Sequence, residues 1–125
     1  MKIYTSYFAN TNKIPLNFIL FSIAGKTPEW FPGKSLKIFA PRYEWWKEWK
    51  SRFADNLESD EAKDFYTKMY TETVLSKIEI PKIKKFFDNL KNVPCLMCYE
   101  RPEKFCHRHL VAEFLNKNGF FVTEC

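Results

Sequence analysis

Residues 94–123, PCLMCYERPEKFCHRHLVAEFLNKNGFFVT, contain the pattern that decides the fold. An apolar run of strand length, Pro94 to Tyr99, leads into a turn that contains Pro102. Hydrophobic residues then recur at helical spacing from Lys104 to Asn118, and the apolar residues Phe120 to Thr123 form a closing strand. A strand, a helix and a strand in this order predict parallel strands joined by a helix that packs on the sheet.

The preceding part of the chain continues this alternation. Strands are predicted at Met1 to Ala9, Asn17 to Ala24 and Ser35 to Ala40. Three helices are predicted. The first spans Arg42 to Phe53, the second begins after an N-cap at Ser59, and the third has Pro81 in its first turn and ends near Asn92. We therefore expect residues 1–125 to form a single domain. Its fold class is three-layer α/β, with a mainly parallel, Rossmann-like sheet and helices on both faces.

Composition limits the cellular setting. Of the 125 residues 46% are hydrophobic and only three are glycine, which argues against a disordered chain. The longest apolar stretch, Phe18 to Ala24, is far shorter than the roughly 20 residues of a membrane helix, and the start of the chain lacks an export signal. We expect a cytoplasmic protein without membrane contact, and therefore expect its four cysteines to be reduced thiols.

Positive charge is concentrated in the first part of the chain. The net charge is +5, and residues 1–52 hold nine Lys or Arg but three acidic residues. A basic surface concentrates anions, so an anionic small molecule or a nucleic acid is an expected partner. A solvated basic face that serves solubility is the alternative.

Residues able to do chemistry are densest between Cys95 and His109. This window of fifteen residues holds three Cys, two His, two Glu and two Arg. Cys98 and Glu100 lie two apart at a strand end and therefore share a face, and the candidates Cys106, His107 and Arg108 fall in the first turn of the next helix. In parallel α/β sheets ligands bind beyond the carboxyl ends of the strands, so these residues are expected at one cleft.

Each of these residue types suits a role in hydrolytic or transfer chemistry. Free N–H groups at the helix start lower the pKa of Cys106 toward the nucleophilic thiolate, and Cys98 is the second candidate nucleophile. Glu100 can act as a general base or nucleophile, with His107 as its proton partner or orienter. Arg108 is predicted to bind an anion through its bidentate donors.

Structural roles remain open for the same residues. Cys98 can be a buried core residue, Glu100 can cap the helix or pair with Arg108, and His107 can be a buried, hydrogen-bonded histidine.

Zinc is an alternative for the cysteines and histidines of this window. Cys95, Cys98, Cys106, His107 and His109 are suitable ligand types at close spacing. On a regular strand Cys95 and Cys98 point to opposite faces, and two adjacent helical side chains diverge by about 100°. We therefore predict no metal site and no cofactor, with zinc as the alternative.

Two segments, Leu96 to Glu100 and Phe105 to Ala112, resemble the signature of the domain-of-unknown-function 488 family. In this family an apolar strand ends in Cys-x-Glu and, after a short loop, a helix opens with Cys-His-Arg. The residues that match the signature are Cys98, Glu100, Cys106, His107 and Arg108. Cys95 and His109 lie outside the shared pattern, so the resemblance counts against a zinc site that uses them.

The resemblance also has a departure. Many relatives carry Asp-Val-Arg at the end of the second strand, where this chain has Ser22-Ile23-Ala24. Arg42 is a candidate replacement for the missing arginine and a second predicted anion-binding residue. The family layout is similar to small nucleotide- and nucleoside-processing domains, which implies a substrate of that class.

The sequence thus supports three hypotheses. The first is an enzyme, a hydrolase or transferase, that acts on a nucleotide, a nucleoside or a nucleic-acid-derived substrate at a Cys/Glu/His/Arg pocket. The second is a nucleic-acid or nucleotide binding module without catalysis, and the third is a thiol redox or metal-binding protein. In the helix after Pro41, Trp45 and Trp49 share a face that can stack on a base or can belong to the core or a dimer contact. Of these, the core or a dimer contact is favoured.

Overall fold

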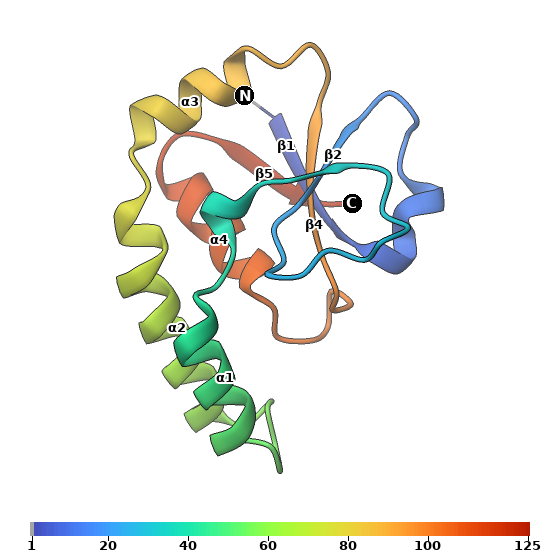
Figure 1. Cartoon of the computed structure of the whole chain (residues 1–125). Coiled ribbons are helices and arrows are strands. Elements are labelled where there is room, and N and C mark those ends of the chain that lie inside the picture. Colours follow the sequence, from blue (N-terminus) through green and yellow to red (C-terminus); the bar gives the residue numbers. More distant parts are fainter. Residues whose placement is uncertain (1) are drawn as a thin grey trace.

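The computed structural model describes residues 2–125 and shows a five-stranded sheet whose neighbouring strands are all parallel. The strands are β1 (Lys2–Tyr7), β2 (Ile19–Ser22), β3 (Lys34–Ser35), β4 (Pro94–Cys98) and β5 (Phe121–Glu124). Their order in the sheet is β3-β2-β4-β1-β5 (Figure 1). The prediction of a parallel, Rossmann-like α/β fold is confirmed.

The connections between the strands contain the helices. They are α1 (Tyr43–Arg52), α2 (Asp60–Thr73), α3 (Ile80–Asp88) and α4 (His107–Lys117), with the short 3-10 helices η1 (Phe8–Lys13), η2 (Lys37–Phe39) and η3 (Leu75–Lys77). Two predicted helix starts are confirmed, because the Ser59 side chain accepts a hydrogen bond from the Ala62 N–H and Pro81 lies in the first turn of α3. Within residues 2–125, none of these helices is long and apolar enough to cross a membrane.

Helix α4 ends as its sequence predicts. Gly119 adopts a φ of 93°, a left-handed conformation that glycine reaches without steric cost. This turn brings the Phe120 N–H to 3.1 Å from the Leu115 carbonyl oxygen, which closes the last turn of the helix. The chain then re-enters the sheet as β5.

The two faces of the sheet are covered unequally. Leu96 and Cys98 of β4 pack in the main core with all four α-helices, whereas Cys95 and Met97 point to the opposite face. Figure 1 shows the α-helices on one side of the sheet and η1 on the other. The second helical layer is therefore a short 3-10 helix, supplemented by the loop that carries Phe31.

Some predicted boundaries are wrong by a few residues. The first strand, expected at residues 1–9, ends at Tyr7, and Met1 lies outside the described residues. The strand expected at residues 35–40 is reduced to Lys34–Ser35, because the chain turns into η2 to bury Phe39. The helix expected from residue 104 begins at 107, and the closing strand begins at 121.

The carboxyl ends of three strands lie level with one another. Tyr7 at the end of β1 is in register with Cys98 of β4, and Ser22 at the end of β2 is in register with Met97. The N-terminus of α4 meets the same edge through the short loop after Cys98. This edge holds the residues that the sequence singled out.

Candidate active site

A cavity of about 680 Å³ opens at the carboxyl edge of the sheet, between β4, α1 and the start of α4. Its volume suits a small-molecule ligand. The lining is mostly aromatic and aliphatic and includes these residues: Ala24, Gly25, Lys26, Ala40, Pro41, Tyr43, Trp46, Trp49, Lys50, Leu57, Tyr66, Cys98, Tyr99, Glu100, Phe105, Cys106 and His107. The four predicted catalytic residues are all among them.

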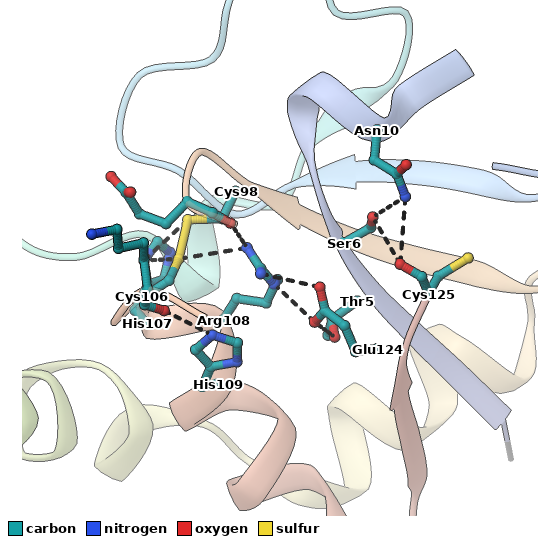
Figure 2. A network of polar contacts seen from close by, with 12 residues as sticks. Thr5, Ser6, Asn10, Cys98, Cys106, His107, Arg108, His109, Glu124 and Cys125 are labelled. Atoms are coloured by element: carbon teal, nitrogen blue, oxygen red, sulfur yellow. Dashed lines mark hydrogen bonds and ion pairs between the residues drawn. A yellow bond between two sulfur atoms is a disulfide. The ribbon is translucent and has the colours of Figure 1, made fainter. Parts of the chain in front are cut away.

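Cys98 and Cys106 meet at the wall of this cavity and form a disulfide (Figure 2). Cys98 ends β4, and Cys106 is the N-cap residue of α4. The expectation that all four cysteines are reduced is thus wrong for this pair, because the loop between them returns the chain to the strand end. Cys95 and Cys125 are free, and burial raises the pKa of the Cys95 thiol to about 12.

His107 is held in one orientation beside the two sulfurs. Its Nε2 lies 2.7 Å from the Ile23 carbonyl oxygen, which only accepts hydrogen bonds, so we assign the ring proton to Nε2. Nδ1 then carries a lone pair, and it lies 3.7 Å from the Cys98 Sγ and 3.9 Å from the Cys106 Sγ. Burial, with smaller effects of the Arg108 and His109 charges, lowers the His107 pKa to about 4, so the ring is neutral near pH 7.

Arg108 lies behind the cluster and is fully buried. Its Nε and one terminal nitrogen donate to the two carboxylate oxygens of Glu124 at 3.1 Å, and the other terminal nitrogen donates to the Glu100 carbonyl oxygen at 2.7 Å (Figure 2). The structure therefore places the predicted anion-binding guanidinium in an internal ion pair. Arg42, the other predicted anion-binding residue, is exposed at the N-cap of α1 and is not part of the cavity lining.

Glu100 is exposed and is one of the residues that line the cavity. Neither structural alternative is realised, because Arg108 pairs with Glu124 and the α4 N-terminus has no side-chain cap. Within the described residues, the Glu100 carboxylate has no hydrogen bond and no ion pair, although the Glu100 carbonyl accepts from Arg108. The carboxylate is thus free to interact with a ligand.

The wall opposite the cysteines comes from α1. Trp46 stacks on Tyr43 with ring centroids 6.3 Å apart, and the Lys50 ammonium lies 5.4 Å from the centre of the Trp46 ring. Trp45 and Trp49 are buried and donate hydrogen bonds to the Thr73 hydroxyl and the Ala62 carbonyl, so of the two favoured roles, core or dimer contact, the structure shows the core.

Two lysines, Lys26 and Lys50, line the cavity, and the sequence did not predict this position for either of them. Lys50 follows Trp46 by one helical turn, a spacing that could have suggested the pair. Lys26 lies in the loop after β2, and its carbonyl accepts a 2.6 Å hydrogen bond from the Tyr99 hydroxyl. No sequence pattern signals that contact.

The ligand atoms of Cys98, Cys106 and His107 lie within 4.8 Å of one another and could hold a metal ion. The prediction that Cys95 points to the opposite face is confirmed. The expected divergence of Cys106 and His107 is wrong, because Cys106 is extended, with φ −152° and ψ 144°, and only His107 is helical. His109 lies outside this group, and its Nε2 is 3.1 Å from the Lys104 carbonyl oxygen.

A comparison with protein-family models identifies a family for this chain. The model of the DUF488-N3a family, described as the active DUF488-N3 subclade, matches residues 27–119. The matched segment contains the whole window from Cys98 to Arg108, and the description indicates catalytic activity and leaves the substrate open. Searches of curated proteins and of solved structures found no match.

Proposed function

We propose, because this chain belongs to the DUF488-N3a family, that the cavity at the carboxyl edge of the sheet is the active site of an enzyme acting on a nucleotide or nucleoside. The observation that carries the proposal is the composition of the lining. One wall is aromatic and cationic, the other carries the Cys98, Cys106 and His107 cluster, and Glu100, whose carboxylate is unpaired, also lines the cavity.

The substrate class follows from the aromatic wall. Tyr43 and Trp46 offer ring faces on which a nucleobase can stack, and such contacts contribute about 1–3 kcal/mol per base. Lys26 and Lys50 line the same cavity, and an ammonium group there neutralises a phosphate. A nucleoside monophosphate combines both features in a volume that the cavity accommodates.

The chemistry we propose is hydrolysis or group transfer. Glu100 is the general base or the nucleophile, since it lines the cavity and its carboxylate is unpaired. When the disulfide is reduced, Nδ1 of His107 can accept the proton of the Cys98 or Cys106 thiol, and the α4 N-terminus stabilises the resulting thiolate at Cys106. Arg108 acts by holding the Glu100 backbone rather than by binding the anion directly.

Substrate binding can be tested by thermal denaturation with a panel of nucleosides and their 5′-monophosphates. A true ligand at 100 times its Kd stabilises the protein by about 2.7 kcal/mol. We expect Trp46→Ala and Lys50→Ala to lose most of this stabilisation. Lys47→Ala, an exposed position on the same helix outside the cavity lining, should keep it. Equal responses in all three variants would contradict the proposal.

Catalysis is tested separately with the ligand found in this way. Glu100→Gln should lower turnover by about 100-fold or more while binding persists, whereas Glu103→Gln on the same exposed loop should have no effect. Full activity of Glu100→Gln would refute its proposed role. Binding without any turnover would favour the binding module instead, and the cytoplasmic location inferred from sequence stays a prediction.

The Cys98–Cys106 disulfide favours thiol redox chemistry as a second candidate function. In that case the reduced pair passes two electrons and two protons to a disulfide substrate and is regenerated by a dithiol. Cys106→Ser should abolish dithiothreitol-driven reduction of a model disulfide, and Cys125→Ser should not. Unchanged activity of Cys106→Ser would exclude this function.

A further inference from the structure

We propose that the reduced protein binds one zinc ion through the Cys98 Sγ, the Cys106 Sγ and His107 Nδ1, with the fourth coordination position open to the cavity. Metal binding follows from the geometry of these three side chains alone. Only the catalytic use of the ion rests on the proposed function.

The distances already fit a shared ion. Zinc–nitrogen bonds of about 2.05 Å and zinc–sulfur bonds of about 2.3 Å at a tetrahedral angle separate nitrogen from sulfur by roughly 3.6 Å. Nδ1 of His107 lies 3.7 Å and 3.9 Å from the two sulfurs. Both nitrogen–sulfur distances therefore fit, and the three-ligand set is completed when reduction lets the two sulfurs separate.

The surroundings of His107 are those of a metal-binding histidine. Such residues donate the distal ring N–H to a carbonyl or carboxylate, which orients the other nitrogen toward the metal. Here Nε2 donates to the Ile23 carbonyl at 2.7 Å, and Nδ1 faces the sulfurs. The orienting contact comes from the end of β2, 84 residues away in sequence, so it does not depend on the local helix.

The electrostatics of the cluster also suit zinc. Two thiolates and one divalent cation sum to zero charge, which lowers the cost of burial for three residues that are all buried. One Arg108 terminal nitrogen lies 3.9 Å from the Cys106 Sγ and can donate to the thiolate. This contact supplies the outer-shell support that metal-bound sulfur usually has.

Three protein ligands leave the site open in the manner of a catalytic zinc. Cys95 is on the opposite face of the sheet, and His109 is directed to the Lys104 carbonyl, so neither completes the set. Cys98, Cys106 and His107 all line the cavity, where a water or a substrate oxygen can take the fourth position. Glu100 lines the same cavity and is the candidate base for that water.

The disulfide and the zinc ion exclude each other. Reduction of the Cys98–Cys106 bond by a thiol or dithiol consumes two electrons and two protons and yields two thiols. Binding of Zn²⁺ then releases both protons, and the sulfurs separate to about 3.8 Å, the spacing of two tetrahedral zinc ligands. The proposed site is therefore present only in the reduced state.

Cobalt substitution tests this directly. Anaerobic protein reduced with a phosphine is titrated with Co²⁺, and one equivalent should produce the visible bands of a tetrahedral ion with near-ultraviolet thiolate charge transfer. Zn²⁺ should displace it at a 1:1 ratio, as measured by elemental analysis. Cys98→Ser, Cys106→Ser and His107→Gln should each weaken Co²⁺ binding by more than about 100-fold, since loss of an outer-shell partner alone costs 10–100-fold.

Controls separate this site from other thiols and from the enzyme hypothesis. Cys95→Ala, Cys125→Ser and His109→Gln should bind Co²⁺ like the wild type, and protein with the disulfide intact should bind none. The proposal is overturned if reduced wild-type protein binds no Co²⁺, or if the oxidised protein binds equally well, a comparison that needs no variant to fold. Since no substrate is added, failure of the nucleotide experiments leaves this outcome unaffected.

Discussion

Removal of the carboxylate that faces Arg108 should destabilise the protein by about 2–3 kcal/mol. Breaking a buried ion pair from one side typically costs roughly 3–5 kcal/mol, because the remaining charge is left without compensation. The Arg108 side chain is 0% exposed and that of Glu124 is 29% exposed, so solvent reaches only one partner and reduces the cost. Glu124→Gln keeps one oxygen for the 2.7 Å hydrogen bond from the Thr5 hydroxyl, and it removes both the charge and the second oxygen that accepts from Arg108.

Urea denaturation at pH 7, followed by tryptophan fluorescence, measures this cost. Arg108→Met keeps much of the apolar stem, and a double-mutant cycle with Glu124→Gln should give a coupling energy of about 1–3 kcal/mol. Glu113→Gln is the matched control, since its ion pair with Lys117 on the exposed face of α4 should contribute less than about 0.5 kcal/mol. A Glu124→Gln variant within 0.5 kcal/mol of the wild type, or an additive double mutant, would refute the reasoning.

Three further outcomes are expected. Burial lowers the His107 pKa to about 4, so as pH falls below about 6.5 the unfolded chain binds a proton at this residue before the folded protein does. The free energy of unfolding of the oxidised protein, measured by urea titration, should therefore be about 2 kcal/mol lower at pH 5 than at pH 8. The His107→Gln variant should lose this pH dependence. Gly33→Ala would place a Cβ against the Leu20 carbonyl and should lower the free energy of unfolding, measured by urea denaturation, by at least about 2 kcal/mol. Gly25→Ala, where nothing lies within 4 Å, should change it by less than about 0.5 kcal/mol. Tyr70→Phe removes a buried 2.7 Å hydrogen bond to a main-chain carbonyl in η2 and should cost about 1–2 kcal/mol, and a thermal melt indistinguishable from wild type would contradict it.

The candidate site was accessible to sequence reasoning where it depends on the order of elements. A strand end followed by a short loop and a helix start brings Cys98, Glu100 and Cys106 to one edge in any parallel α/β sheet, and the structure places all three at the cavity. Their chemical roles stay predictions. The cavity itself was not predictable, because its opposite wall is formed by Trp46 and Lys50 of α1, about fifty residues earlier in the chain.

Arg108 illustrates why residue type alone was insufficient. At the helix start it has the chemistry of an anion-binding residue, and the acid that the sequence offered as its partner was Glu100. The acid that occupies it, Glu124, comes from β5, which lies beside β1 at the edge of the sheet. Only the pairing of β5 with β1 brings this carboxylate under α4.

The sequence by itself determined the parallel α/β class, the helix start at Ser59 and the helix stop at Gly119, because periodicity and capping depend on residues within a few positions of one another. Only the tertiary structure decided the Cys98–Cys106 pairing, the ring orientation of His107 and the partner of Arg108. Each depends on a backbone direction or on an acceptor from another strand, and the extended conformation of Cys106 turned two adjacent residues toward one point. Local propensity does not specify such contacts, since they form only when the sheet and its helices have packed.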